Sequence, residues 1–509
     1  MNYLLINKEN SNLKTLILCS IGVVSLFVFF LQLVLYKNII IGISIVAILC
    51  MSTVMFLLFL VFGIKKVLLI LFFSSMAFNV EFPLYPFGGG YSTNHPGGLR
   101  GALVINHFFL IILALSLLSL KRVIKNGLLL KKNDVSLELI LFSIFIMTAI
   151  ISFFFSDNYA AASYVVSRLL FMYLLMTLLL KYEFLDIWNK FLTGIMILLP
   201  IQFIIGILQY ITEKPIGLRV LGESKNPFRE DTVYGAAEKG LSGTLGHPGI
   251  LGVFVIILIP FLVVYYFSSE KRSSFKNSIV ILSILTSVLI VFLTNARTSI
   301  AIMFLTFLLA FSGTLLIKYL KNESITKFML YLFTFSILFI IAIIIFSDSL
   351  IERFGGSDLL YQADYRGGLS LISWNIITLN LKNLILGVGP NNYTDTLAGI
   401  GTGFAYTQPV HNLYLLLFAE GGILHALCYI ALLITIICKM IVVLMQKGSH
   451  SYYALAILIS ILNIAIYNFT GWANYNNQNF ILFVVIFVLA VKVYQEHKKQ
   501  MGVANVNRK

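Results

Sequence analysis

Long apolar runs separated by polar connections are the dominant pattern of this chain. A membrane-spanning helix needs about 20 mostly apolar residues. Fourteen runs are candidates, of which the third is short and the twelfth is long: residues 13–36, 39–63, 67–80, 102–120, 135–155, 160–180, 184–210, 249–268, 279–294, 299–317, 328–346, 412–438, 452–470 and 479–494. The pattern predicts an all-α polytopic membrane protein with about 14 transmembrane helices.

Two long polar intervals interrupt this alternation and divide the chain. Connections of such length are uncommon in compact domains unless they are functional or disordered. We therefore expect five parts: N-terminal transmembrane helices (1–210), an outer loop (211–248), further transmembrane helices with a hairpin (249–346), a large outer loop that carries the chemistry (347–410), and C-terminal transmembrane helices with a cytoplasmic tail (411–509).

The large loop contains a helical pattern of its own. Apolar residues recur at near-helical spacing from Arg366 to Leu386, and the turn Gly387-Val388-Gly389-Pro390 follows. A glycine just past the last turn and a proline soon after it are typical helix stop signals. The pattern predicts an amphipathic helix on the outer membrane surface that begins at Arg366, with an apolar face made by Leu369, Ile372, Ile376, Ile377 and Leu381.

Composition and charge agree with a membrane protein. Of 509 residues, 59% are hydrophobic and 11% are charged, and the mean hydropathy is +0.95, which excludes a soluble domain of this size. Placing the N-terminus inside puts most short lysine- and arginine-bearing connections in the cytoplasm, as the positive-inside rule requires. We expect both termini to be cytoplasmic and the first apolar run to act as a signal anchor. The net charge of +15 then reflects orientation and attraction to membrane lipid, with no nucleic acid partner.

Neither a metal nor another cofactor is expected. The four cysteines, Cys19, Cys50, Cys428 and Cys438, lie within apolar runs without paired metal-ligand spacing. The outer loops contain no tight acidic cluster. Packing is the expected task of these cysteines.

Arg168 and His247 are the first two polar residues in unusual places. Arg168 lies inside a predicted span, where a charge costs about 2.5 to 3.5 kcal/mol unless the side chain snorkels or faces a polar cavity. A functional role and snorkelling both remain open for it. His247, in Gly246-His247-Pro248-Gly249, could assist catalysis or be a simple turn residue.

Arg297 lies in the short connection Thr294 to Ser299 between two predicted spans. A guanidinium is always protonated and offers a planar fork of donors that fits phosphate or carboxylate oxygens. A tight hairpin would hold that fork with little freedom. The alternative is an ordinary anchor at the membrane interface.

His411 precedes the next apolar run and begins the motif H-N-L-Y-L-L-L-F-A-E-G-G-I. A histidine at the wet end of a helix can accept a proton near neutral pH. Glu420 would lie about 13 Å farther along a regular helix. It could therefore orient His411 only if the segment folds back or breaks at Gly421-Gly422, and otherwise it would pair with another base.

The order of these motifs resembles a known family. T-N-A-R-T-S between two helices is followed by Arg366 ahead of W-x-x-x-x-x-x-L, by L-G-V-G-P-x-N-Y and by the H-N motif. From about Gly243 to Ile423 the chain resembles the bacterial O-antigen ligase and O-antigen polymerase superfamily. Those integral membrane glycosyltransferases take glycan from undecaprenyl pyrophosphate at the outer face of the inner membrane.

The resemblance implies roles for particular residues. The arginine at the hairpin tip, the arginine of the loop helix and the histidine match Arg297, Arg366 and His411, which are the expected catalytic residues. Two fixed guanidinium groups can stabilise a pyrophosphate leaving group in place of a metal, and the histidine can act as general base. Five further residues are expected to bind substrate: Arg168, His247, Asn412, Tyr414 and Glu420.

The resemblance also implies partners and a location. The donor would be a glycan linked to undecaprenyl pyrophosphate, the acceptor a glycan or lipid-linked glycan, and the site would face outward from the bacterial cytoplasmic membrane. The long chain with two large outer loops favours a polymerase of surface polysaccharide. An O-antigen ligase that transfers glycan to lipid A core is the alternative. A lipid-linked oligosaccharide flippase is the rival from another class, although the chain shows no convincing internal repeat and its unusual polar residues gather at one face.

Overall fold

The computed structural model describes the chain in several stretches. They are residues 64–86, 102–108, 110–115, 136–224, 229–231, 236–238, 240–268, 273–326, 358–399, 409–446 and 448–506, with single helical residues between 328 and 347. The chain divides into two compact units, Met1–Phe72 and Phe73–Lys509. Helix α3 (Ile64–Ser74) crosses this boundary, and everything below concerns the second unit.

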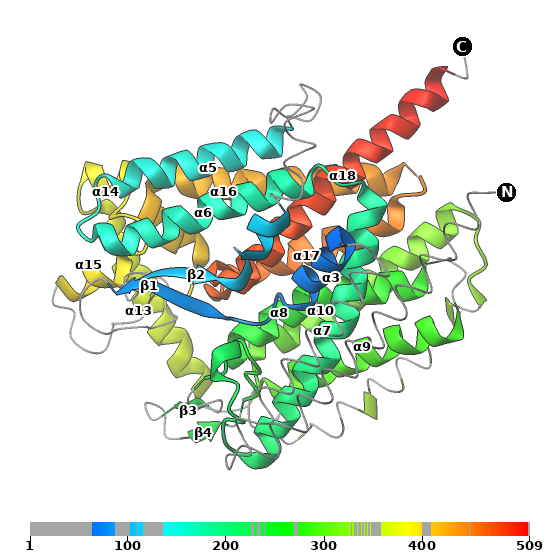
Figure 1. Cartoon of the computed structure of the whole chain (residues 1–509), viewed down its shortest axis with the longest axis horizontal. Helices are drawn as coiled ribbons and strands as arrows, with labels where there is room; N and C mark the ends of the chain where they lie inside the picture. The colour runs from blue at the N-terminus through cyan, green and yellow to red at the C-terminus, as the bar shows by residue number, and fades with distance from the viewer. Residues whose placement is uncertain are drawn as a thin grey trace, which may run out of the picture. The chain divides into compact units, whose positions relative to one another are not determined.

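Apolar helices make up most of the second unit (Figure 1). The helices are α5 (Leu137–Phe153), α6 (Tyr159–Leu179), α7 (Phe184–Thr212), α8 (Pro248–Phe267), α9 (Ser274–Leu293), α10 (Arg297–Leu320), α13 (Asp358–Thr378), α14 (Leu381–Leu386), α15 (Tyr393–Gly399), α16 (Leu413–Met445), α17 (Ser451–Tyr467) and α18 (Asn477–Val506), with the short 3₁₀ helices η2 (Arg219–Leu221) and η4 (Ala473–Tyr475). The bounds of α5 to α10 and of α17 lie within about five residues of the predicted spans, whereas α16 and α18 continue beyond the predicted ends at residues 438 and 494.

Among the described residues, seven helices are long and apolar enough to cross a membrane: α6, α7, α8, α9, α10, α16 and α18. Helices α5 and α17 are apolar but shorter. The prediction of a multi-pass membrane protein is therefore confirmed. The count of about 14 stays a prediction, because spans 13–36 and 39–63 lie outside the described residues and 328–346 is described only in part.

Two small hairpins accompany the helices of this otherwise all-α unit. Strand β1 (Glu81–Pro86) pairs antiparallel with β2 (Ala102–Asn106), where the apolar pattern predicted that a span would begin at residue 102. In the predicted outer loop, β3 (Arg229–Asp231) pairs with β4 (Ala236–Glu238). The first difference has a local cause, since β1 contains two prolines, and β2 ends in Val-Ile-Asn, whose β-branched residues favour an extended backbone.

Helix α8 lies at the centre of the second unit, packed against α9, α10 and α17. Nearly all of its side chains are buried. Polar side chains of α17 hydrogen-bond across this core: Ser460 donates to the carbonyl of Ile257 at 2.8 Å, and Asn463 Nδ2 donates to the carbonyl of Ile256 and to the Thr306 hydroxyl, each at 2.8 Å. Bonds of this kind hold apolar helices in one register.

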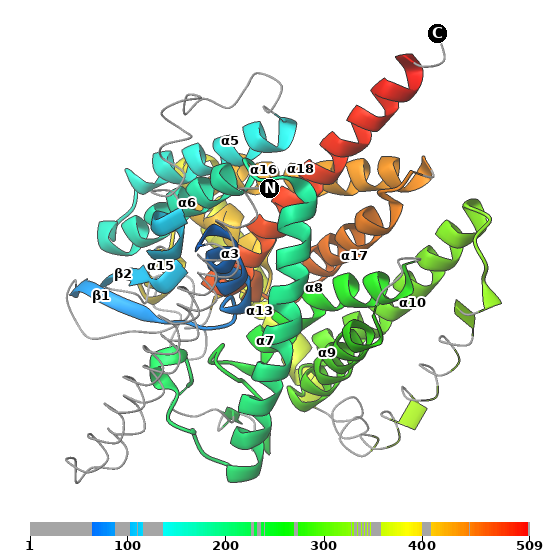
Figure 2. The same cartoon turned by 45° about the vertical axis from the view of Figure 1, so that its right-hand side comes forward.

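Helices α5 and α16 run antiparallel and lie side by side (Figures 1 and 2). Near one end, Lys439 pairs with Glu138 at 2.6 Å. Near the other end, the Ser152 hydroxyl donates to the carbonyl of Glu420 at 2.8 Å. These two contacts fix how far one helix can slide along the other.

The helices end at two opposite ends of the second unit. Helices α8, α10 and α16 begin, and α17 finishes, at one of them, which we call the site end. The end where α10 finishes and α17 begins is the opposite end. The positive-inside prediction assigns the site end to the outside and the opposite end to the cytoplasm.

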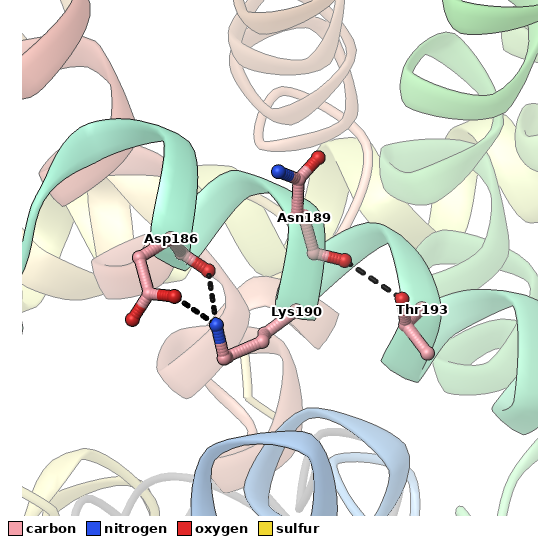
Figure 3. Close-up of polar contacts among 4 residues, drawn as sticks. All are labelled: Asp186, Asn189, Lys190 and Thr193. Carbon is pink, nitrogen blue, oxygen red and sulfur yellow. Dashed lines mark hydrogen bonds and ion pairs between the residues drawn. The ribbon is translucent and has the colours of Figure 1, made fainter. Parts of the chain in front are cut away.

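The first turns of α7 carry a local polar group (Figure 3). Lys190 pairs with the carboxylate of Asp186 one turn earlier, and the Thr193 hydroxyl donates to the carbonyl of Asn189 at 2.8 Å. The Asp186 side chain is about a third exposed. This is an ordinary intrahelical surface pair.

Candidate active site

His247 and Arg297 stand at the starts of two touching helices. His247 is the N-cap of α8, and its Nδ1 accepts a hydrogen bond from the backbone N–H of Gly249 at 3.0 Å. A neutral imidazole in this arrangement carries its proton on Nε2. Arg297 is the first residue of α10. The two helices touch closely here, since a Cβ added to Gly252 would lie 2.6 Å from Ser299 Oγ.

Tyr467, the last residue of α17, is a common neighbour of these elements. Its hydroxyl would be 3.8 Å from a Cβ on Gly249, beside the His247 cap. The charge of Arg366 acts on the same hydroxyl. Tyr467 thus lies between the start of α8 and the helix that carries Arg366, and the sequence interpretation had not singled it out.

His411 lies just before α16 and is held against the end of α17. The backbone N–H of Leu413 donates to the carbonyl of Asn468 at 2.8 Å. Asn412 is the N-cap of α16 and accepts from the N–H groups of Tyr414 and Leu415 at 3.0 and 3.2 Å. The Tyr414 hydroxyl donates to the carbonyl of Ala465 at 2.9 Å. Asn412 and Tyr414 therefore have structural tasks, and their contact with substrate stays a prediction.

The structure thus brings His247, Arg366 and His411 near the end of α17, and Arg297 begins α10, which packs against both α8 and α17. Arg297, Arg366, His247 and His411 come from four different elements. All four side chains are half-buried, so they are both held by the protein and open to a ligand.

The helix that carries Arg366 begins earlier than the apolar pattern indicated. Helix α13 begins at Asp358, so Arg366 lies in its third turn and not at its start. The earlier turns contain Asp358, Gln362 and Asp364 among apolar and aromatic residues, and these polar residues obscured the apolar spacing. Leu369, Ile376 and Ile377 are buried, as expected.

The predicted single helix is also broken at Asn380. Its side chain caps α14 by accepting from the N–H of Asn383 at 2.8 Å. Asn383 Nδ2 donates back to the carbonyl of Ile376 at 3.0 Å. Leu381 belongs to the second helix and is exposed, so it is not part of the predicted apolar face.

Two motifs that are far apart in the sequence meet in one structure, which we call the glycine clasp: residues 387–390 docked on residues 419–422. Helix α16 breaks at Gly422, whose φ is 79° and ψ 179°. The break frees carbonyls that the next turn would have used. The N–H groups of Val388 and Gly389 donate to the carbonyls of Ala419 and Glu420, at 2.8 and 3.0 Å.

Only glycine fits at the two contact points of the glycine clasp. A Cβ on Gly387, with φ 76°, would lie 2.3 Å from the carbonyl oxygen of Glu420, and a Cβ on Gly422 would lie 2.0 Å from that of Ile385. The positive φ angles independently favour glycine. The clasp fixes α14 against α16 and so positions Glu420.

Arg168 and Glu420 form a second polar group deeper in the second unit. Arg168 is only 5% exposed, so it does not snorkel. Its Nη1 donates to the carbonyl of Tyr475 at 2.8 Å and to Asn477 Oδ1 at 3.2 Å, and its guanidinium lies 4.5 Å from the centre of the Tyr475 ring. The Tyr475 hydroxyl donates to Glu420 Oε2 at 3.5 Å.

The phenols beside Glu420 stay protonated. The pKa of Tyr393 is raised to about 12, chiefly by burial, against the lowering effect of a Ser373 hydrogen bond and with a smaller contribution from the Glu420 charge. Burial, followed by the Glu420 charge, also raises the pKa of Tyr475. Both tyrosines are therefore neutral donors at physiological pH.

Glu420 does not reach His411 by the route that the sequence suggested. The break in α16 falls at Gly422, after Glu420, and residues 413–420 form regular helix. The break therefore does not bring Glu420 back toward His411. Glu420 instead belongs with Tyr475 and Arg168.

The asparagine-rich segment, residues 468–479, was missed by the sequence interpretation and connects the two polar groups. Asn474 Nδ2 donates to Asn468 Oδ1 at 2.7 Å, and Asn468 Nδ2 donates to the Tyr429 hydroxyl at 3.0 Å. Asn479 Nδ2 donates to the carbonyl of Ile250 in α8 at 3.4 Å. The signal was the density of uncharged amides in N-F-T-G-W-A-N-Y-N-N-Q-N, which a search for charges overlooks.

The described part of the chain contains no group of three or more histidine, cysteine or acidic side chains that could hold a metal ion. A comparison with models of known protein families gives no match, and neither does a comparison with curated protein sequences. The function therefore has to be argued from the site.

Proposed function

We propose that the chain is a glycosyltransferase of the bacterial cytoplasmic membrane that polymerises a surface polysaccharide. It transfers glycan from undecaprenyl pyrophosphate to the end of another lipid-linked glycan. The observation that carries this proposal is that Arg297, Arg366 and His411, from three separate elements, lie at the site end. Two cations and one base at the same end suit the displacement of an anionic leaving group by a hydroxyl.

The chemistry assigns a task to each residue. Arg297 and Arg366 hold the pyrophosphate and stabilise the charge that develops on it as the bond from the sugar C1 to the phosphate oxygen breaks. His411 accepts the proton of the acceptor hydroxyl as that oxygen bonds to C1. The pyrophosphate leaves on its lipid, and the histidine later releases the proton to water. Because the guanidinium groups supply the positive charge, we expect activity to persist in EDTA.

The predicted orientation would give both substrates access to the site. The lipid tail of the donor would lie between helices, where α16 exposes Ile423, Leu424 and Leu427. The acceptor would come from the aqueous side at the site end. A membrane-impermeant thiol reagent should label cysteine introduced at Asp358 in intact cells and should not label cysteine at Lys321. Labelling of Lys321→Cys would contradict this orientation.

A ligase reaction uses the same three residues, with lipid A core as the acceptor. The polymerase is preferred because of the long chain and its two large outer loops. Incubation of the purified protein with undecaprenyl-pyrophosphate-linked glycan, with and without lipid A core, separates the two. Lengthened lipid-linked chains indicate a polymerase, transfer to the core indicates a ligase, and an unchanged donor in both reactions would refute the proposal.

A flippase is a second candidate for a specific reason. Arg168 and Glu420 are charged groups buried among helices, and α16 is broken beside them, both of which occur in transporters. Reconstitution in proteoliposomes distinguishes this candidate. A flippase moves the lipid-linked glycan between leaflets without changing its length, whereas the proposed enzyme changes its length.

A further inference from the structure

Residues 240–245, near the end of the predicted outer loop, form an irregular stretch whose residues are all buried. We call it the buried segment. Irregular backbone normally lies at the surface, because its N–H and carbonyl groups need partners that a protein interior seldom offers. At membrane depth such backbone is tolerated only where the surrounding protein satisfies it. The partners of the buried segment therefore identify the residues that hold it in place.

Two glutamines of helix α7 are partners of the buried segment. Gln202 Nε2 donates to the Thr244 hydroxyl at 2.7 Å, and Gln202 Oε1 accepts from the backbone N–H of Thr244 at 3.1 Å. Gln209 Oε1 accepts from the N–H of Gly243 at 3.0 Å, and Gln209 Nε2 donates to the Gly243 carbonyl at 3.1 Å. The Thr244 hydroxyl in turn donates to the carbonyl of Ala77 at 2.8 Å. Both glutamines are fully buried and lie about two turns apart on α7.

The depth of Gln202 in the predicted span makes these bonds important. Gln202 lies eight residues before the predicted end of this span at residue 210, which is about 12 Å along a helix. An amide in an apolar interior without hydrogen bonds costs about 1 to 3 kcal/mol in proteins. The four bonds from the two amides offset this cost and tie the buried segment to α7.

The buried segment also contacts the hairpin that leads to Arg297. The backbone N–H of Leu241 donates to the carbonyl of Leu293, the last residue of α9, at 2.9 Å. A Cβ on Gly240 would lie 3.0 Å from the carbonyl oxygen of Thr294, the next residue. Helix α10 begins at Arg297, directly after this turn. The buried segment therefore connects α7 to the hairpin that carries the arginine.

Helix α8 confines the same hairpin, and α9 packs against both α7 and α8 (Figures 1 and 2). A Cβ on Gly252 of α8 would lie 3.2 Å from Thr294 Oγ1. The Thr294 hydroxyl donates to the carbonyl of Val291 at 2.7 Å. With α8 and the buried segment both in contact with Thr294, the start of α10 has little freedom to move.

We propose that Gln202 and Gln209 are positioning residues for Arg297. They hold the buried segment, which fixes where the hairpin places the guanidinium, and they need not touch substrate themselves. A misplacement of about 1 Å far from the chemistry can lower a rate by about 10²-fold. This inference rests on the proposed function, in which Arg297 holds the pyrophosphate.

Thr244 offers the sharpest test, because its hydroxyl can be removed with almost no change in side-chain shape. Thr244→Val loses the hydroxyl bonds to Gln202 and Ala77, whereas Thr244→Ser keeps a hydroxyl. Thr148→Val is the matched control. The Thr148 hydroxyl is also buried, but it lies 2.9 Å from His425 Nδ1 and joins α5 to α16.

A double-mutant cycle separates positioning from a loss of folded protein. The rate of transfer from undecaprenyl-pyrophosphate-linked glycan is measured per amount of folded enzyme. We expect Thr244→Val to lower this rate about tenfold or more, and Thr244→Ser and Thr148→Val to keep it. In the Arg297→Lys background, Thr244→Val should change the rate less than about twofold, because residues that act as a unit are not additive. An equal loss in both backgrounds would overturn the proposal, since purely structural damage does not depend on Arg297.

Amide hydrogen exchange of the full-length protein tests the same connection without substrate. Thr244→Val, Gln202→Leu and Gln209→Leu should each speed exchange at Leu241 and at residues 294–299, while Thr148→Val should not. Wild-type exchange at residues 294–299 in all three variants would overturn the proposal. Faster exchange there in a protein whose wild type has no transferase activity would refute the proposed function and leave the anchoring of the Arg297 hairpin standing.

Discussion

Charged side chains have different partners at the two ends of the second unit. Toward the opposite end, opposite charges meet directly. Lys439 lies 2.6 Å from Glu138, and Lys318 lies 3.4 Å from Glu323, which also accepts a hydrogen bond from the Tyr452 hydroxyl at 2.8 Å. The first pair joins α5 to α16, and the Tyr452 hydroxyl connects the second pair to α17.

Toward the site end, charges are held by neutral groups instead. Arg168 is bound by a carbonyl, an amide oxygen and an aromatic face, and Glu420 by a phenol. Holding a charge in this way stabilises its position without cancelling it. The difference teaches that a buried charge in this chain can be held either by an opposite charge or by neutral groups such as asparagine, tyrosine and backbone carbonyls.

The largest effect is expected from Arg297 and Arg366, the two arginines of the site end. Arg297→Lys and Arg366→Lys keep the charge but lose the planar fork that fits a phosphate. Each should lower the transfer rate by about 10²-fold or more, as the loss of a fixed transition-state donor does, while membrane insertion stays normal. Rates near wild type in both variants would remove these residues from the pyrophosphate site.

The next largest effect is expected on stability, from a substitution in the glycine clasp. Gly422→Ala would force a side chain into a backbone conformation with φ 79° and against a carbonyl 2.0 Å away. Strain and overpacking together should cost roughly 2 to 5 kcal/mol, measured as a lower unfolding temperature in detergent. Gly367 in α13 is the matched control, because a Cβ there meets nothing within 4 Å. Equal stability of the two variants would show that the glycine clasp is not formed.

The smallest effects are expected from two ion pairs, one buried and one at the surface. Glu138 is 1% exposed, so Glu138→Gln leaves Lys439 without its carboxylate and should cost about 1 to 3 kcal/mol. Asp186→Asn breaks the surface pair of Figure 3 and should cost at most about 1 kcal/mol, an effect that salt reduces. The loss of stability in each variant is measured by thermal unfolding at low and high salt. A larger loss of stability for Asp186→Asn than for Glu138→Gln would contradict the assignment of one pair to the surface and the other to the interior.

The apolar helices could be predicted from the sequence because burial in lipid demands long apolar runs. The start of α13 could not be predicted, because Asp358, Gln362 and Asp364 interrupt the apolar pattern of its first turns. The glycine clasp joins residues more than 30 positions apart, and no local pattern reveals that Gly387 and Gly422 serve one contact. The sequence could not decide whether Arg168 snorkels or has a functional role, because only the structure places Tyr475 beside it.

The candidate site was predicted in part. Arg297, Arg366, His247 and His411 were singled out from sequence, and the structure brings them to one end of the second unit. The asparagine-rich segment was not singled out from the sequence, since amide side chains carry no charge and a run of them resembles an ordinary connection. Its importance follows from its hydrogen bonds to four different helices, which are contacts between residues far apart in the sequence.

Donor binding and turnover, measured on the same preparation of His411→Ala, test the central claim most directly. If His411 is the general base and the arginines hold the pyrophosphate, the variant should bind undecaprenyl-pyrophosphate-linked glycan with wild-type affinity. Its transfer rate should fall by about 10² to 10⁴-fold, the usual contribution of general base catalysis. A variant that binds the donor poorly, but regains the full rate in excess donor, would show that His411 binds substrate and that another group is the base.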